Sequence, residues 1–199
     1  SDFPDSVFVE DTAVILPELA VITRPGADSR KPETESILQA LMPLIKCVRL
    51  QAPATLDGGD VLVLEKQIFI GLSTRSNQAA IDQLHEMLDT YGYSVTGVQM
   101  HDCLHLKSAV SQVDDKTILI NPNWVDTHHF TDFHCIEVDP SEPFAANCLP
   151  IRDFVIFPTA FPITHQKLEK AGFKVVTVDV SELAKAEGAV TCCSLVLPD

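Results

Sequence analysis

A repeated order of predicted elements limits the fold of this chain more than any other feature of its sequence. Patterns typical of strand, strand, helix and strand follow one another four times, and a truncated fifth copy opens at Val190–Leu197. Units of this kind, each about 35–50 residues long, are typical of a closed ring or an open solenoid. If the units close into a ring, its first and last segments share one unit, and the rest of the fifth unit is expected before Ser1.

Apolar periodicity and turn-forming residues set the expected boundaries of these elements. Strands are predicted at residues 7–16, 20–23 and 48–50, at 61–64, 68–70 and 94–98, at 104–110, 117–120 and 135–138, and at 147–151, 154–157 and 175–178. Helices are predicted at residues 32–46, from a cap at Ser76 or Asn77 to a stop at Gly92, and near residues 164–171, whereas the third unit has only a poorly marked linking segment. Because Pro43 falls inside the apolar stripe of the first helix, that helix should kink or end early.

Polar residues recur where the first strand of each unit begins. They are Glu10 with Asp11, the segment Asp57–Asp60, His105, and Cys192. In a ring, equivalent positions of the units converge near the axis, so these side chains would meet in one pocket. A solenoid would spread them along an edge instead.

The composition is that of a single globular domain spanning residues 1–199. A hydrophobic content of 46% is enough for a sizeable core, and the net charge of −14 argues against nucleic acid as a partner. The charge fits either simple solubility or a preference for a cationic substrate.

No apolar run approaches the ~20 residues of a membrane span, and the start, which lacks an initiator Met, shows no signal peptide. Six cysteines in such a chain indicate reduced thiols and a cytoplasmic location.

A thiol, an imidazole and a carboxylate at equivalent places are the parts of a nucleophilic cysteine site. Cys192 is either the nucleophile, which must be activated because a free thiol has a pKa of ~8.5, or a buried structural cysteine. Cys193 follows it on the predicted strand and should point to the opposite face. His105 is either a general acid and base or a core histidine, and Asp57 either orients the imidazole or belongs to an Asp-Gly turn.

Further charged residues near these positions suit a substrate that carries both a cation and a carboxylate. Asp5, Glu10 and Asp11 either hold a guanidinium or mark an exposed strand end. Arg30 and Arg75 are either carboxylate anchors or solvated surface arginines. No CxxC pair or regular ligand spacing is present, so no metal is predicted.

Six segments, in order from one end of the chain to the other, carry a family resemblance. They cover residues 4–11, 22–30, 55–60 (Thr-Leu-Asp-Gly-Gly-Asp), 71–78, 104–108 (Leu-His-Leu-Lys-Ser) and 191–194 (Thr-Cys-Cys-Ser), whereas residues 113–143 match poorly. Together they resemble the dimethylarginine dimethylaminohydrolases of the pentein superfamily. The resemblance implies an α/β fold, a fivefold pseudosymmetric propeller of ββαβ units, which agrees with the repeat. Family chains continue upstream of Ser1, so the N-terminal unit is expected to be incomplete here.

The resemblance also implies a reaction, the hydrolysis of Nω,Nω-dimethyl-L-arginine or Nω-methyl-L-arginine to citrulline and dimethylamine or methylamine, without a cofactor. Cys192 resembles the nucleophile that attacks the guanidino carbon to form a covalent thiouronium. His105 resembles the group that protonates the departing amine and then activates water, and Asp57 resembles its orienting partner.

Residues similar to the family's substrate ligands fall into three sets. The sets are Asp5 and Asp11 with Glu10 beside them for the guanidinium, Arg30 and Arg75 for the α-carboxylate, and the backbone carbonyl of Ala186 for the α-amino group. The substrate is therefore expected to be held at both of its ends.

Lys107 bears on the choice among related enzymes. Arginine deiminases of the superfamily carry an Asp two residues after the catalytic His, where this chain has Lys107, and the difference favours a methylated substrate. The alternatives are another guanidine-modifying enzyme, such as a deiminase or an amidinotransferase, and an inactive pentein that acts as a binding module. Besides a small-molecule substrate, the only partner carried forward is a second copy of the chain in a homodimer.

Overall fold

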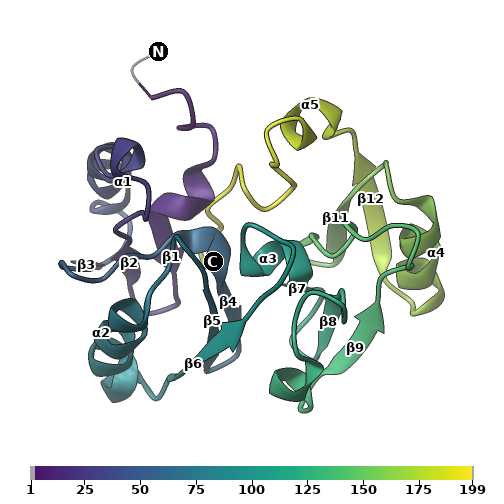
Figure 1. Ribbon diagram of the computed structural model, residues 1–199, viewed down its shortest axis with the longest axis horizontal. Helices are drawn as coiled ribbons and strands as arrows, with labels where there is room; N and C mark the ends of the chain where they lie inside the picture. The colour runs from purple at the N-terminus through teal and green to yellow at the C-terminus, as the bar shows by residue number, and fades with distance from the viewer. Residues whose placement is uncertain (1–2, 199) are drawn as a thin grey trace.

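The structure, a computed structural model, describes residues 3–198 and contains four three-stranded sheets set around a common centre (Figure 1). In every sheet the first two strands pair antiparallel and the second and third pair parallel. The strands of the four sheets are β1 (Ala13–Ile15), β2 (Ala20–Ile22) and β3 (Cys47–Arg49); β4 (Val61–Leu64), β5 (Gln67–Leu72) and β6 (Ser94–Gln99); β7 (Val110–Gln112), β8 (Thr117–Ile120) and β9 (His134–Glu137); and β10 (Leu149–Ile151), β11 (Phe154–Pro158) and β12 (Lys174–Val178). The predicted fourfold repeat is confirmed.

A crossover joins the second and third strands of each unit, as parallel pairing requires. The crossovers contain α1 (Glu33–Leu41), α2 (Gln78–Leu88), a 3-10 helix at Thr127–Phe130 in the poorly marked third unit, and α4 (Pro162–Lys170). The remaining short helices are α3 (Leu106–Ala109), α5 (Ser181–Ala184) and the 3-10 helices η1 (Val9–Thr12), η2 (Asp28–Arg30), η3 (Gly58–Asp60) and η4 (Asp89–Tyr91). None of the helices within residues 3–198 has the length and apolar character needed to span a bilayer.

The helix boundaries follow the local signals in the sequence. Helix α1 ends at Leu41, two residues before Pro43, so the early end is confirmed. The side chain of Asn77 accepts a hydrogen bond from the amide of Ala80 at 3.1 Å and thus caps the start of α2. Gly92 ends this crossover in the left-handed conformation, with a φ of 76°.

The first strands of the units lie innermost, where β7 contacts both β4 and β10. Strand β4 is buried at Val61, Leu62 and Leu64, and the central strand β8 is buried along its whole length. Full burial of one such aliphatic side chain stabilises the fold by about 1.5–3 kcal/mol. The apolar core therefore fixes each sheet and leaves the ends of the inner strands free for polar groups.

Three predicted strands are wrong at the places where polar residues occur. Residues 9–12 form a 3-10 helix, residues 106–109 form one turn of α-helix, and residues 190–193 form a turn. In each case the backbone amide donates its hydrogen bond to a group that does not belong to a neighbouring strand, so no strand pairing forms there. The carbonyl of Cys192 accepts from Glu10, the carboxylate of Asp60 from Leu106, and the side chain of Asn147 from Thr191. Cys192 and Cys193 thus lie on a turn rather than on opposite faces of a strand.

Candidate active site

A cavity of about 280 Å³ collects the residues that the sequence singled out. The predicted site residues that line it are Asp5, Asp11, Arg30, Asp57, Arg75, His105, Ala186 and Cys192. They come from η1 and the loop before it, from η2, from the residue before η3, from the loop between β5 and α2, from the residue before α3, and from the segments that follow α5. Segments far apart in the chain therefore meet in one pocket, as expected of a ring and not of a solenoid.

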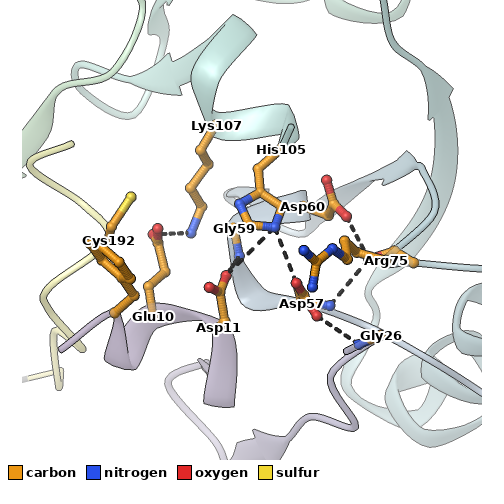
Figure 2. Close-up of polar contacts among 12 residues, drawn as sticks. Glu10, Asp11, Gly26, Asp57, Gly59, Asp60, Arg75, His105, Lys107 and Cys192 are labelled. Carbon is orange, nitrogen blue, oxygen red and sulfur yellow. Dashed lines mark hydrogen bonds and ion pairs between the residues drawn. The ribbon is translucent and has the colours of Figure 1, made fainter. Parts of the chain in front are cut away.

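Asp57 holds the imidazole of His105 from one side of the cavity. The His105 Nε2 and Asp57 Oδ2 atoms lie 3.2 Å apart, and Figure 2 shows both Asp57 and Asp11 directed toward the ring. Asp57 is 1% exposed, its Oδ1 accepts from the amide of Gly26 at 2.8 Å, and its own amide donates to Ser76 Oγ at 3.1 Å. A carboxylate fixed in this way can orient the imidazole and stabilise its protonated form.

Opposing effects set the protonation of His105. Burial of the imidazole lowers the pKa of His105, whereas the hydrogen bond with Asp57 and the negative charges of Asp11, Asp60 and Asp57 raise it. The net result is a pKa above the ordinary value of histidine. His105 therefore holds a proton more readily near neutrality, which suits an acid that must protonate a leaving group.

Two glycines let the backbone of η3 approach the site closely. A Cβ atom on Gly59 would lie 2.7 Å from His105 Nδ1 and 3.0 Å from Asp11 Oδ1. A Cβ atom on Gly58 would lie only 2.0 Å from the carbonyl oxygen of Glu10. Any larger residue at either position would displace the site, so the pair Gly58-Gly59 is needed for its geometry.

Cys192 lines the cavity with a half-buried thiol, and Cys193 does not line it. Burial, together with the negative charges of Glu10 and Asp11, raises the pKa of the Cys192 thiol to about 12, against a smaller lowering by the amide of Ala189, which donates to Sγ at 3.3 Å. The thiol is therefore neutral in the empty site. A bound cation would offset the carboxylates and favour the thiolate.

Two acidic side chains beside Cys192 already have partners. Glu10 accepts from Lys107 Nζ at 2.7 Å and from Thr191 Oγ1 at 2.8 Å, and it is the one predicted site residue that does not line the cavity. Asp11 accepts from the amide of Gly59 at 3.0 Å and from the Arg30 guanidinium. Figure 2 shows Glu10 directed toward Lys107, on the side of the site opposite Asp57.

Arg30 and Arg75 differ in how many hydrogen bonds and ion pairs their guanidinium groups make. Arg30 is 6% exposed, pairs with Asp11 and with Glu33 Oε2 at 2.8 Å, and donates to the carbonyls of Asp5 at 3.2 Å and Phe8 at 2.9 Å. The half-buried guanidinium of Arg75 makes no hydrogen bond or ion pair with any other residue of the described range 3–198. Arg75 is thus the cation of the cavity that is ready to accept an anionic group.

Three of these groups have the spacing of a metal site. Asp11, Asp57 and His105 each offer one ligand atom, and the atoms lie within 4.8 Å of one another. Each of them is, however, already engaged in the hydrogen bonds described above, and the Asp57–His105 pair is the arrangement that acid–base chemistry needs. Hydrogen bonding within the site accounts for the cluster without a metal ion.

The cavity also contains residues to which sequence reasoning gave no role. Phe8, Leu104 and Glu187 line it, and Glu187 takes a φ of 59° beside Ala186. Asp60 was noted only as the end of a polar segment, although it is fully buried. The signal that could find them is their place in the sequence, because Leu104 and Glu187 directly flank His105 and Ala186, and Phe8 lies two residues before Glu10.

Comparisons with known proteins cover nearly the whole chain. The family model for arginine deiminase matches residues 1–147. A Pseudomonas aeruginosa protein named N(G),N(G)-dimethylarginine dimethylaminohydrolase is 37% identical over 195 residues, which are 97% of this chain and 77% of that protein. A Streptomyces coelicolor protein of the same name is 38% identical over 196 residues, which are 98% of this chain and 75% of that protein.

A solved structure shows that the similarity extends to the fold. It is dimethylarginine dimethylaminohydrolase from Pseudomonas aeruginosa, in a variant with one cysteine replaced by serine and in complex with citrulline. Its TM-score against this chain is 0.92 at 36% sequence identity, and the match covers 96% of this chain and 76% of that one. The fourfold repeat described above is thus part of a known α/β architecture.

Proposed function

The chain belongs to the dimethylarginine dimethylaminohydrolase family, which has the pentein fold, and we propose that it hydrolyses Nω-methylated arginines to citrulline and dimethylamine or methylamine. The observation that carries this proposal is the meeting of Cys192 and the His105–Asp57 pair with acidic groups and the free Arg75 in one cavity. A substrate with a cation at one end and a carboxylate at the other matches that distribution of charge. The complex of the Pseudomonas aeruginosa relative with citrulline supports the same choice of product.

The first half of the reaction begins when the substrate cation enters. Its charge offsets Glu10 and Asp11, so the pKa of the Cys192 thiol falls and the thiolate forms. The sulfur attacks the guanidino carbon and forms a C–S bond. His105 gives its proton to the methylated nitrogen, the C–N bond breaks, and the amine leaves a thiouronium on Cys192.

The second half of the reaction uses His105 as a base. The neutral imidazole takes a proton from a water molecule that attacks the thiouronium carbon. The C–S bond then breaks with its electron pair on sulfur, so that citrulline is released and the Cys192 thiolate is restored. Asp57 orients His105 and stabilises the imidazolium each time it forms.

The substrate α-carboxylate is assigned first to Arg75, because its guanidinium has no partner within residues 3–198. Arg30 also lines the cavity and is proposed as the second cation near that group, although its main contacts are with Asp11 and Glu33. The carbonyl of Ala186, on the cavity wall, is proposed for the α-amino group.

Asp5 and Asp11 are proposed to face the substrate guanidinium, since both line the cavity beside Cys192. Glu10 lies beside Asp11 in the chain but does not line the cavity. Its two carboxylate oxygens accept hydrogen bonds from Lys107 and Thr191. Glu10 therefore does not present a free carboxylate to an unsubstituted guanidinium nitrogen. This arrangement favours methylated arginines over arginine.

The test is product analysis by mass spectrometry after incubation with dimethylarginine, methylarginine or arginine. Citrulline with dimethylamine or methylamine is expected, together with little or no ammonia from arginine, and Cys192→Ser serves as the inactive control. Ammonia from arginine as the main product would make the chain a deiminase. No product from any guanidine, with a thiol that resists labelling by amidine reagents, would favour an inactive binding module.

A cytoplasmic location is part of the same proposal. All six cysteines are free thiols in the structure, which is the state expected in a reducing compartment. Fractionation of cells that produce the protein would test this location.

A further inference from the structure

Asp60, the last residue of η3, is a fully buried carboxylate that the mechanism above does not use. Three donors surround it. Ser73 Oγ donates to Asp60 Oδ2 at 2.8 Å, Ser76 Oγ donates to the same oxygen at 2.6 Å, and the amide of Leu106 donates to Oδ1 at 3.1 Å. A buried charge needs such partners, and these three donors also connect Asp60 with residues of the site.

Each of the two serines passes the contact on to a residue of the site. Ser76 Oγ accepts from the amide of Asp57 at 3.1 Å, so it fixes the backbone of the residue that orients the imidazole. Ser73 Oγ accepts from the amide of Arg75 at 2.9 Å, so it fixes the start of the proposed carboxylate anchor. Neither serine lines the cavity, and their contacts are therefore with the protein and not with the substrate.

The third donor leads to His105. Leu106 is the first residue of α3 and directly follows His105, so the bond from its amide to Asp60 fixes the backbone from which the imidazole projects. Figure 2 shows Asp60 next to His105 and Arg75, at the side of the site away from Cys192. One carboxylate thus reaches three separate functional groups through one intervening residue each.

We propose that Asp60 is a positioning residue that sets the places of Asp57, Arg75 and His105 together, an assignment that rests on the proposed function. A substrate must be held by its carboxylate while its guanidino carbon lies within reach of the nucleophile and the acid. Because both requirements depend on one buried group, the distance between the anchor and the imidazole is fixed by the protein. Displacements of about 1 Å in such a geometry reduce rates by ~10²-fold.

Only a carboxylate can accept from all three donors. An asparagine at position 60 has one accepting oxygen and one donating nitrogen. If its oxygen faces the serines, its NH₂ group faces the amide of Leu106; if its oxygen faces Leu106, its NH₂ group faces two hydroxyls that already accept from backbone amides. In both orientations at least one donor loses its acceptor.

The electrostatics agree with a role in geometry rather than in stability. Burial raises the pKa of Asp60, against smaller lowering effects of His105, Ser76, Ser73 and the amide of Leu106. A pKa raised above the unfolded value means that the ionised form is disfavoured in the folded state, so at neutral pH the charge costs stability. Its negative charge is also one of those that raise the pKa of His105.

The experiment compares Asp60→Asn with Ser76→Ala and Ser73→Ala, in steady-state kinetics with dimethylarginine and in NMR titration of the His105 imidazole. Ser76→Ala should act through Asp57, so we expect a kcat reduced ~10-fold or more and a lower pKa of His105. Ser73 Oγ accepts from the amide of Arg75 at 2.9 Å and from the amide of Ser76 at 3.2 Å, so Ser73→Ala should act mainly through Arg75 and less through Ser76. We expect a KM raised ~10-fold with a smaller change in kcat. Asp60→Asn should show both effects with little loss of thermal stability.

The matched control is Thr164→Ala, which also removes a buried hydroxyl that bonds to the backbone, here the amide of Asp139 at 3.0 Å, away from the site. It should leave KM, kcat and the pKa of His105 within twofold of the unaltered chain. The assignment is overturned if Thr164→Ala reproduces the pattern, or if Asp60→Asn keeps kcat, KM and the His105 titration. The NMR titration requires no turnover, so it tests Asp60 even if the unaltered chain proves inactive toward dimethylarginine and the proposed function fails.

Discussion

The thiol of Cys192 illustrates how single residues set the chemistry. Because its pKa is raised to about 12 by burial and by the charges of Glu10 and Asp11, the free enzyme holds a neutral thiol at neutral pH. We predict that the cationic reagent chloroacetamidine alkylates Cys192 much faster than neutral chloroacetamide, because a bound cation offsets Glu10 and Asp11, lowers the pKa of the Cys192 thiol and so raises its thiolate fraction. The rates are measured by mass spectrometry, and labelling by chloroacetamide should keep rising as the pH is increased well above 9.

The neighbouring cysteine provides the control for this prediction. Cys192→Ser should abolish both turnover and labelling, whereas Cys193→Ser should keep most of both, because Cys193 does not line the cavity. Equal rates for the two reagents, or a label found on Cys193, would contradict the assignment.

The two arginines should fail in different ways when they are removed. Arg75→Ala should raise KM for dimethylarginine by roughly 10- to 150-fold with an unchanged melting temperature, since a charged hydrogen bond contributes about 1.5–3 kcal/mol. Arg30→Ala leaves Asp11 and Glu33 buried without their partner, so it should lower the free energy of unfolding by about 3–5 kcal/mol and reduce kcat as well.

Kinetics and thermal unfolding of both arginine variants check this contrast. A small amidine reagent that lacks a carboxylate should still label Cys192 in Arg75→Ala. If Arg75→Ala loses labelling as severely as turnover, the arginine supports the thiolate and the anchor role is wrong.

At the scale of elements, the 3-10 helix η3 passes beneath the imidazole with no room for a side chain at Gly59. In Gly59→Ala the new methyl group would lie 2.7 Å from His105 Nδ1, so the ring must move and kcat should fall by ~10²-fold. Gly92→Ala is the matched control, because its Cβ meets nothing within 4 Å and its positive φ of 76° costs only about 1 kcal/mol of stability. Retained activity in Gly59→Ala, or an equal loss in Gly92→Ala, would refute the argument.

At the scale of the whole molecule, one buried network joins units that are distant in the chain. Thr191 Oγ1 donates to Glu10 at 2.8 Å and accepts from Asn147 at 3.0 Å, and Asn147 also donates to the carbonyl of Lys107 at 3.0 Å. The first, third and fourth units are thus connected with the segment that carries Cys192 through Glu10, Lys107, Asn147 and Thr191. We predict that Thr191→Val lowers the free energy of unfolding by about 1–3 kcal/mol and speeds hydrogen exchange of the amides near Cys192.

A buried threonine away from this network is the control. Thr164 Oγ1 accepts from the amide of Asp139 at 3.0 Å, so Thr164→Val should lose similar stability but keep kcat. Thr191→Val should in addition reduce kcat, because Cys192 directly follows the altered residue. Equal kcat values in the two variants would show that the network contributes stability alone.

The same scale explains what the sequence could predict. Strands β4 and β8 lie at the predicted residues, because each pairs with a neighbour close in sequence and its apolar pattern is read locally. His105 and Cys192 were placed on strands that do not form, since the amides around them are accepted by Asp60 and Asn147 from other units. The ion pairs of Arg30 with Asp11 and Glu33 could not be predicted either, because the sequence does not show which residues a charged side chain contacts. Local patterns therefore predicted the sheets, whereas contacts between units decided the details of the site.

The bond between the amide of Glu10 and the carbonyl of Cys192, 3.1 Å long, has a consequence for the order of events during protein synthesis. A ribosome makes Glu10, Asp57 and His105 long before Cys192, so these residues can meet only after Cys192 has left the exit tunnel. Nascent chains that stop short of Cys192 contain His105 and Asp57 but lack the proposed nucleophile, so they cannot form the proposed site. Assembly of the site thus has to wait until Cys192 has been translated.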